Sequence, residues 1–249
     1  MRRRLTVMLV AAAMAALVLA MAGVAWAQDT SGCKGDIVLD PGHGGTDTGA
    51  VYNANGIYIT EKAQVLKVAY ILKGILQQDG YGVCMTRGGD PSNANGPRVK
   101  DPGDDAFADD ATLSNNDRYT YANTTGAKVL VSIHMNGSTD PKVDYTTTLF
   151  GKWQKDKAFA YSIFGDNVNP PTYGLRTLLA ANGMVNYIAT KTPYSYASGV
   201  LLKSNMPATI AETVFITNHD EAKLLSNGTN ERQHQIAVAL EKGINSYLK

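Results

Sequence analysis

Histidine and cysteine are scarce in this chain of 249 residues, which has four of the first and two of the second. Because there is no Cys-x-x-Cys pair, a redox or thiolate-metal site is not expected. The sequence also lacks a Gly-x-Ser-x-Gly elbow, a Gly-x-x-x-x-Gly-Lys-Ser/Thr loop and a His-Glu-x-x-His helix. It therefore does not match serine hydrolases, P-loop nucleotide hydrolases or thermolysin-like zinc proteases.

Residues 1–27 are expected to be a signal peptide rather than part of the fold. Arg2–Arg4 form a basic segment, the apolar run Leu5–Trp26 follows, and Ala25–Ala27 has the small-x-small pattern of a signal peptidase site. The run is also long enough to span a bilayer, so an uncleaved anchor is the alternative. An exported protein, located in the periplasm or in the cell wall and outside the cell, is predicted.

The charge balance gives no sign of a nucleic-acid partner. Without residues 1–27 the 23 Lys and Arg residues fall to 20 against 22 Asp and Glu residues, a net charge of −2. Binding to phosphates would call for a basic patch instead. Residues 28–36 then form a short N-terminal segment, and residues 37–249 have the length of one domain.

The two cysteines, Cys33 and Cys84, each lie at or just before the start of an apolar, strand-like run. In an oxidising compartment we expect a disulfide that joins the two strand starts. A pair of buried thiols is the alternative.

Strand-like and helical patterns alternate along residues 36–249, which predicts a mainly parallel sheet with helices on both faces. The expected strands are the apolar runs at 36–40, 83–86, 128–134, 146–150 and 208–214. The expected helices begin at about 61, 115, 155, 173 and 230 and end at about 79, 123, 164, 181 and 247. Gly88–Thr112 is crowded with Gly, Pro, Asp and Asn and is expected to be a long loop, either functional or mobile.

Two of the four histidines directly follow apolar strands. His43 lies in the loop after the first strand and His134 ends the run 128–134, so in a parallel sheet both reach the carboxyl edge. Glu61 opens the next helix, and Glu212 lies in the run 208–214 between apolar neighbours. Imidazoles with a carboxylate are the usual ligands of a catalytic zinc ion, so these four residues are candidates for a metal site.

Each candidate also has a plain structural explanation. A histidine at a strand end often forms only surface hydrogen bonds, Glu61 could be an acid favoured by the helix dipole, and Glu212 could face solvent on an edge strand. Only their joint placement favours a metal. The other histidines are expected to be structural, with His219 in the helix start Thr217–Asp220 and His234 on the polar side of the last helix.

Several spaced blocks occur in a recognisable order along the chain. They are Ile37–Gly45, Glu61-Lys62 ahead of Leu66, Thr86-Arg87, Arg118 with Ala122-Asn123, Ser132–Asn136 and Met206–Asn218. In this order they resemble the type 3 catalytic domain of zinc-dependent N-acetylmuramoyl-L-alanine amidases, over residues 37 to about 248.

The resemblance implies a single α/β domain with a central, mostly parallel six-stranded sheet and helices on both faces. It implies one Zn²⁺ held by His43, Glu61 and His134, with Glu212 as the catalytic acid/base. The implied reaction uses a zinc-activated water to cleave the amide between the lactyl group of N-acetylmuramic acid and the L-alanine of the stem peptide in peptidoglycan. Alternatives are a zinc hydrolase acting on another wall bond and a catalytically silent peptidoglycan-binding protein.

The resemblance also suggests the partners. Peptidoglycan is the expected partner, for a monomer that has no stable membrane association after signal cleavage. The sequence does not identify a regulatory protein partner. Asp40 and Asn136 are candidates either for hydrogen bonding to the histidines or for stabilising turns. Arg118 is expected to be a structural ion-pair or packing residue rather than a catalyst.

Two regions depart from the family pattern. Val214 replaces the glycine usual after Glu-Thr, which is expected to narrow or reshape the cleft beside Glu212. No motif is recognised over Asp140–Ala197, so substrate choice and any gating helix are expected there. The Gly88–Thr112 loop is a second candidate for an element that contacts substrate.

Overall fold

The computed structural model describes residues 33–88, 105–108, 113–151, 154–165, 173–176 and 192–249. Within them a seven-stranded sheet has the order β5-β4-β1-β6-β9-β7-β8, and every pairing is parallel except that of β7 with β9. The strands are β1 (Ile37–Pro41), β4 (Val83–Gly88), β5 (Asp105–Ala108), β6 (Val129–Asn136), β7 (Thr147–Phe150), β8 (Tyr194–Ser195) and β9 (Ala208–Phe215). The predicted α/β domain with a mostly parallel sheet is confirmed; the two-residue β8 is added at the edge to the six strands expected.

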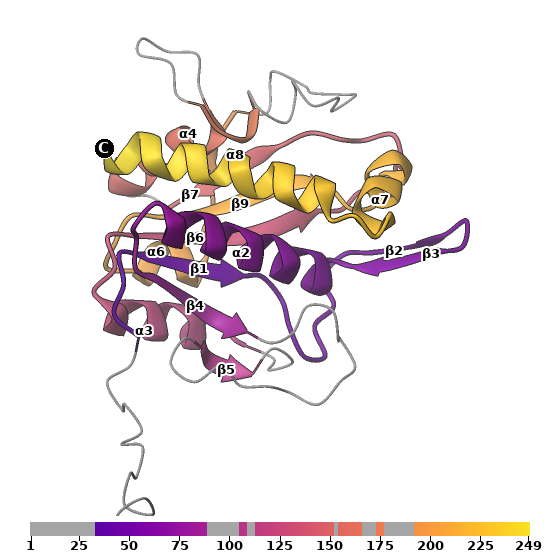
Figure 1. Cartoon of the computed structure of the whole chain (residues 1–249). Helices are drawn as coiled ribbons and strands as arrows, with labels where there is room; N and C mark the ends of the chain where they lie inside the picture. The colour runs from indigo at the N-terminus through magenta and orange to yellow at the C-terminus, as the bar shows by residue number, and fades with distance from the viewer. Residues whose placement is uncertain (1–32, 89–104, 109–112, 152–153, 166–172, 177–191) are drawn as a thin grey trace, which may run out of the picture. The chain divides into compact units, whose positions relative to one another are not determined.

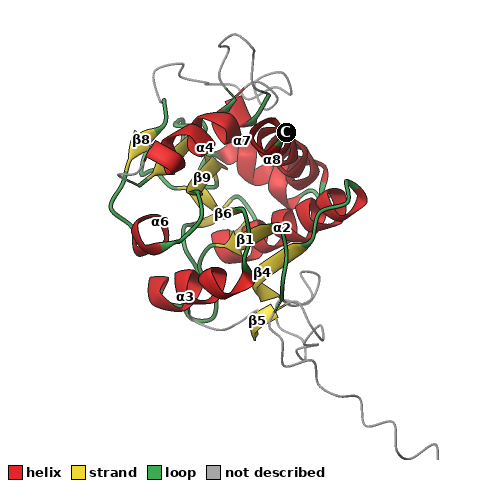
Figure 2. Ribbon diagram, turned by 90° about the vertical axis from the view of Figure 1, so that its left-hand side faces the viewer, coloured by secondary structure: helices red, strands yellow, loops and turns green. Residues whose placement is uncertain are grey.

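Helices cover both faces of this sheet (Figure 1, Figure 2). One apolar core lies under α2 (Glu61–Gln78), α4 (Gln154–Phe164), α7 (His219–Ser226) and α8 (Glu231–Leu248). A second core lies between the other face and the helices α3 (Asn115–Thr125) and α6 (Gly199–Lys203). In the described part of the chain, no helix has both the length and the apolar character needed to cross a membrane.

Alternation along the strands explains the two cores. Leu39 and Val131 point into the first core, while their neighbours Val38 and Leu130 point into the second. Burial on both faces is the reason why these strands read as continuous apolar runs in the sequence.

Several short elements were not predicted. The strands β2 (Val51–Ala54) and β3 (Ile57–Thr60) form an antiparallel hairpin ahead of α2. The prediction that Gly88–Thr112 is a loop throughout is wrong, because the segment contains β5, which pairs with β4 at the sheet edge. Four residues without an apolar period leave no strand signal in the sequence. Of the helix predicted at 173–181, only residues 173–176 lie within the described part of the chain.

Cys33 and Cys84 form the predicted disulfide, which links the segment before β1 to the neighbouring strand β4. The two cysteines are separated by 51 residues in the sequence. Closing a loop of this size destabilises the unfolded chain by about 4 kcal/mol in the chain-entropy estimate. The bridge therefore fixes the start of the two strands whose other ends lead to the candidate site.

The carboxyl ends of β1, β6 and β9 meet at one edge of the sheet, because these neighbouring strands are parallel. The chain leaves β1 at Pro41 and the amide of Gly42 still donates to the carbonyl of Ile133 on β6. The loop that follows β1 is thereby held beside the end of β6.

Candidate metal site

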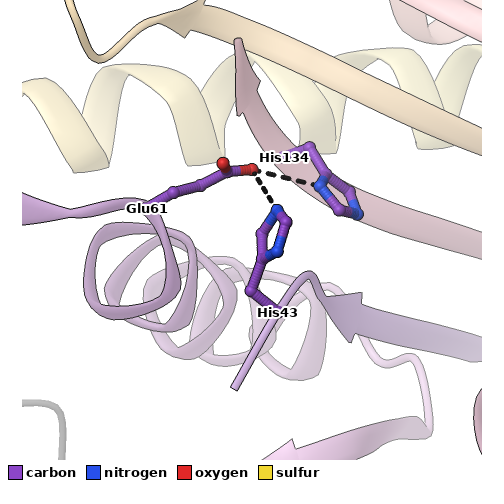
Figure 3. Close-up of side chains that lie close together, drawn as sticks. All are labelled: His43, Glu61 and His134. Carbon is purple, nitrogen blue, oxygen red and sulfur yellow. Dashed lines mark hydrogen bonds and ion pairs between the residues drawn. The ribbon is translucent and has the colours of Figure 1, made fainter. Parts of the chain in front are cut away.

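The structure brings His43, Glu61 and His134 together at the carboxyl edge of the sheet (Figure 3). Oε1 of Glu61 lies 3.0 Å from Nε2 of His43 and 3.1 Å from Nδ1 of His134. Ligand atoms of all three residues lie within 4.8 Å of one another. Two imidazoles and one carboxylate at this spacing can hold a metal ion and leave a position for water.

Glu61 is held in place by backbone amides as well as by the histidines. Its Oε1 accepts a hydrogen bond from the amide of Met135, and its Oε2 accepts one from the amide of Ala50. Both bonds are 2.9 Å long. The carboxylate at the start of α2 is therefore oriented before any ligand binds.

Two buried arginines hold the loop that carries His43. Arg87 donates to the carbonyl oxygens of Pro41 and Gly42, at 2.9 and 2.8 Å. Arg118 donates to the carbonyl of His43 at 2.7 Å. These guanidinium groups supply partners to carbonyls that a buried turn would otherwise leave unsatisfied.

Arg118 is itself held by Asp40, at 2.6 Å from Nη1 to Oδ1. The Asp40 carboxylate also accepts hydrogen bonds from the hydroxyls of Thr86 and Ser132. Burial would raise the pKa of Asp40, but Arg118 and the two hydroxyls outweigh it and lower the pKa below its ordinary value. Asp40 thus contacts the arginine that holds the loop of His43.

Two glycines make room for the cluster. A Cβ at Gly49 would lie 2.6 Å from both Oε2 of Glu61 and Cδ2 of His43, and one at Gly42 would lie 2.3 Å from Cε1 of His134. The backbone of Gly49 also has φ +63°, in the left-handed region that favours glycine. A side chain at Gly42 or Gly49 would clash with the side chains of the His43–Glu61–His134 cluster.

Asp47 was not identified from the sequence as a partner of the site. Its Oδ2 lies 2.8 Å from Nδ1 of His43, and its Oδ1 accepts a hydrogen bond from the amide of Gly49. Because an ionised carboxylate can only accept, the contact with Asp47 keeps a proton on Nδ1, and Nε2 is the ring nitrogen that points at Glu61 and into the cluster. The only sequence signal was the place of Asp47 in the same glycine-rich loop, four residues after His43.

The electrostatics of the cluster favour a cation. Burial raises the pKa of Glu61, but His134 and His43 outweigh it and lower the pKa to about 2. Burial lowers the pKa of His43. The carboxylates of Glu61 and Asp47 raise it by more, so the pKa of His43 lies above its ordinary value. A metal ion would supply the positive charge beside the Glu61 carboxylate in place of the protons on the imidazoles. The three donor groups therefore fit zinc in their chemistry as well as in their spacing.

Glu212 stands beside the cluster on β9. It is the Cα partner of His134 on β6, and partners on adjacent strands point to the same face of the sheet. Burial raises the pKa of Glu212 above its ordinary value, an effect that the His134 imidazole opposes. A partly buried carboxylate with a raised pKa next to a metal site is suited to accept and return a proton. Since β9 lies between β6 and β7, Glu212 is not on an edge strand.

The cluster opens into a cleft of about 400 Å³. His43, His134 and Glu212 form part of its wall, with Asn115 and Arg118 from α3. Further along, the wall is formed by Leu149, Tyr194, Tyr196, Ser198, Val200 and Ile210. The His43–Glu61–His134 cluster is therefore accessible from a cleft large enough to hold part of a small molecule or polymer.

The remaining predicted residues lie as follows. Asn136 lines the cleft and its Oδ1 accepts from the amide of Gly137, a bond within the turn. His219 hydrogen-bonds to the hydroxyl of Tyr52 in the hairpin, and His234 is exposed on α8. Neither of these histidines lies in the metal cluster of the described residues.

The expectation that Val214 narrows the cleft is wrong. Val214 is fully buried in the core under α2 and α8 and does not line the cleft. The pairing of β6 with β9 shifts register between His134 and Asn136. After this irregularity the alternation along β9 changes phase, so Val214 points to the face opposite Glu212.

The sequence profile of the N-acetylmuramoyl-L-alanine amidases matches residues 37–246. The chain belongs to this family. It is 29% identical to N-acetylmuramoyl-L-alanine amidase AmiA of Escherichia coli (strain K12), over 87% of this chain and 77% of the relative. Every residue placed in the candidate site lies within the range 37–246 that the family profile matches.

Solved structures of the family have the same fold. The catalytic domain of CwlV, an N-acetylmuramoyl-L-alanine amidase from Bacillus (Paenibacillus) polymyxa var. colistinus, is 26% identical with a TM-score of 0.63, covering 85% of this chain and 97% of that domain. The CwlD amidase from Clostridioides difficile, solved in complex with the GerS lipoprotein, is 25% identical with a TM-score of 0.64 and covers 85% of this chain and 97% of its own.

Proposed function

We propose that this protein is a zinc-dependent peptidoglycan hydrolase that cleaves the amide between the lactyl group of N-acetylmuramic acid and L-alanine. The observation that carries the proposal is the placement of Glu212 beside a His43–Glu61–His134 cluster in an open cleft. Family membership supports the choice of bond.

The three cluster residues are proposed to hold one Zn²⁺. When bound there, zinc supplies Lewis acidity that lowers the pKa of water and polarises the amide carbonyl. Asp47 keeps the proton of His43 on Nδ1 and so presents Nε2 to the metal. The backbone bonds of Glu61 keep its carboxylate aimed at the same point.

Glu212 is proposed to carry the proton through the reaction. Its carboxylate takes one proton from the attacking water, whose oxygen bonds to the amide carbon. When the C–N bond breaks, Glu212 returns that proton to the departing alanine nitrogen. The products are a lactyl carboxylate on the glycan and a free amine on the peptide, so no serine or cysteine nucleophile is needed.

Metal analysis of the purified domain tests the site. The wild type is expected to contain one zinc per chain and to release stem peptides from purified peptidoglycan, and His43→Ala is expected to lose both. His234→Ala removes an exposed histidine far along the chain and serves as the matched control. A His43→Ala variant that keeps full zinc content would disprove the assignment of the ligands.

The cellular setting is also proposed. We infer that residues 1–27 are an export signal and that the domain acts as a monomer on peptidoglycan in the periplasm or the cell wall. We also propose a regulatory protein partner, because the CwlD amidase of the same family was solved in complex with the GerS lipoprotein. Secretion of a reporter fused after residue 27, with loss of export after Arg2–Arg4 are changed to Gln, tests the signal.

A further inference from the structure

Two tyrosines line the same cleft as the metal cluster but come from a distant part of the sequence. Tyr194 belongs to β8 and Tyr196 follows it directly. Their side chains are 47% and 52% exposed, although most aromatic side chains of the described chain are buried or half-buried. Exposed aromatic rings on the wall of a cleft indicate a surface for binding.

The strand pairing places these tyrosines on the same face of the sheet as the catalytic groups. A row of cross-strand partners runs from β6 to β8 and consists of Ser132, Ile210, Leu149 and Tyr194. Partners in such a row share a face, and Tyr196 is two residues after Tyr194. Since neighbouring strands are about 4.8 Å apart, β8 lies about 10 Å from the strand of Glu212.

The two halves of the cleft differ in charge. Charged groups gather at the end formed by β1, β6 and α3, where His43, Asp47 and Arg118 lie. Toward β8 the lining between the tyrosines and Glu212 is apolar or neutral, with Leu149, Val200, Ile210 and Ser198. A stem peptide carries carboxylates, which bind more tightly next to cationic side chains. The described lining of the cleft toward β8 contains no Lys or Arg side chain.

A sugar ring fits the tyrosine half better. Its C–H faces pack on aromatic rings, and its hydroxyls can hydrogen-bond to phenolic oxygens. We infer that Tyr194 and Tyr196 form a sugar subsite that binds the muramic acid end of the glycan, so that the stem peptide extends toward the charged half. This inference rests on the proposed function and assigns the two ends of the substrate to the two ends of the cleft.

The test compares two substrates that share the scissile amide. One is a disaccharide peptide, and the other is the same peptide carrying only the lactyl group without a sugar. In Tyr194→Ala/Tyr196→Ala the ratio of kcat/KM for the first to that for the second is expected to fall roughly tenfold or more, mainly through KM. Tyr194→Phe/Tyr196→Phe keeps the rings and is expected to retain most of the ratio.

Tyr58→Ala is the matched control, because Tyr58 is an exposed tyrosine on the hairpin, 66% accessible and outside the cleft. A second readout avoids turnover: glycan chains stripped of peptide are titrated into Glu212→Gln, with and without the two tyrosine changes. Weaker glycan binding after the tyrosine changes supports the subsite.

Equal losses on both substrates, or unchanged glycan binding, would overturn the subsite while leaving the proposed function intact. Loss that grows with the length of the peptide would assign the tyrosines to the peptide instead. A wild-type enzyme inactive on both substrates would instead refute the proposed function, so the two failures are distinct.

Discussion

Asp47 and His43 form a carboxylate–imidazole pair, with 2.8 Å between Oδ2 and Nδ1, on the far side of the ring from the metal cluster. The pair fixes the tautomer and the orientation of the imidazole. His43 also has φ 60°, an uncommon conformation for a residue other than glycine. The backbone of this loop and the Asp47 carboxylate together hold the His43 ring so that Nε2 points toward Glu61 and His134.

The first prediction concerns this pair. Asp47→Ala is expected to weaken zinc binding by roughly 10- to 100-fold, since partners of ligating histidines commonly contribute that much. Asp47→Asn keeps an acceptor and is expected to lose less. Competition with a chromophoric chelator measures the affinity, and Asp220→Ala, at an exposed acid of α7, is the control. Equal affinity in Asp47→Ala and wild type would show that the pair has no role in binding.

A second prediction separates steric exclusion from backbone strain. Gly49 and Gly56 both have positive φ, +63° and +77°, but only a Cβ at Gly49 would meet the cluster. Gly56→Ala is expected to cost about 1–2 kcal/mol of stability and to keep zinc. Gly49→Ala is expected to lose zinc binding as well. Urea unfolding and metal content measure the two effects, and zinc retained at wild-type affinity in Gly49→Ala would contradict the geometry.

The buried ion pair of Arg118 and Asp40 leads to a third prediction. Arg118→Met leaves the Asp40 carboxylate unpaired in the interior and is expected to destabilise the protein by about 3–5 kcal/mol. Adding Asp40→Asn should restore part of this loss, because the unpaired charge is then gone. Lys128→Met breaks the exposed pair with Asp36 and should cost under about 1 kcal/mol. If the losses of unfolding free energy in Arg118→Met and Asp40→Asn simply add in the double variant, the two side chains are not coupled.

A fourth prediction concerns pH and lies away from the metal. Burial and the neighbouring Glu221 carboxylate raise the pKa of Asp144 from 3.8 to about 7, while the amide of Phe215 and Arg232 oppose the shift. Glu221 is itself paired with buried Arg232. Between these two pKa values the folded state holds a proton that the unfolded state releases, so this contribution to stability is lost as pH rises toward and through 7.

Asp144→Asn removes this titration. The loss of stability between pH 5 and pH 7.5 should be smaller in Asp144→Asn than in the wild type, as measured by urea unfolding at both pH values. Asp140→Asn changes an exposed acid of the same loop and should follow the wild type. An unchanged pH dependence in Asp144→Asn would show that Asp144 does not titrate in this range.

The main elements could be predicted because their apolar periods are long. α2 and α8 have sustained apolar stripes, and β6 and β9 are mainly apolar runs bounded by polar turns. The hairpin β2–β3 was missed although its turn, Asn55-Gly56, is a recognised hairpin signal; both residues have positive φ. The strand β5 could not be predicted, because it has only four residues and lies within a sequence segment rich in Gly, Pro, Asp and Asn.

The part of the site that lies at the ends of strands, or at the start of the helix after β1, could be predicted from the sequence. His43, Glu61 and His134 meet because parallel strands and the helix after β1 deliver them to one edge. Asp47 depends on the fold of a glycine-rich loop, and Tyr194 depends on the register of a two-residue strand at the sheet edge. Neither is visible in a local pattern, because long-range pairing and backbone dihedrals determine them.

Product analysis of digested peptidoglycan by mass spectrometry tests the central claim most directly, with the wild type compared with Glu212→Gln. The wild type is expected to yield intact stem peptides with a free alanine amine and glycan with free lactyl carboxylates. Glu212→Gln is expected to keep its zinc and to yield neither product. New termini inside the peptide, or full activity in Glu212→Gln, would contradict the account.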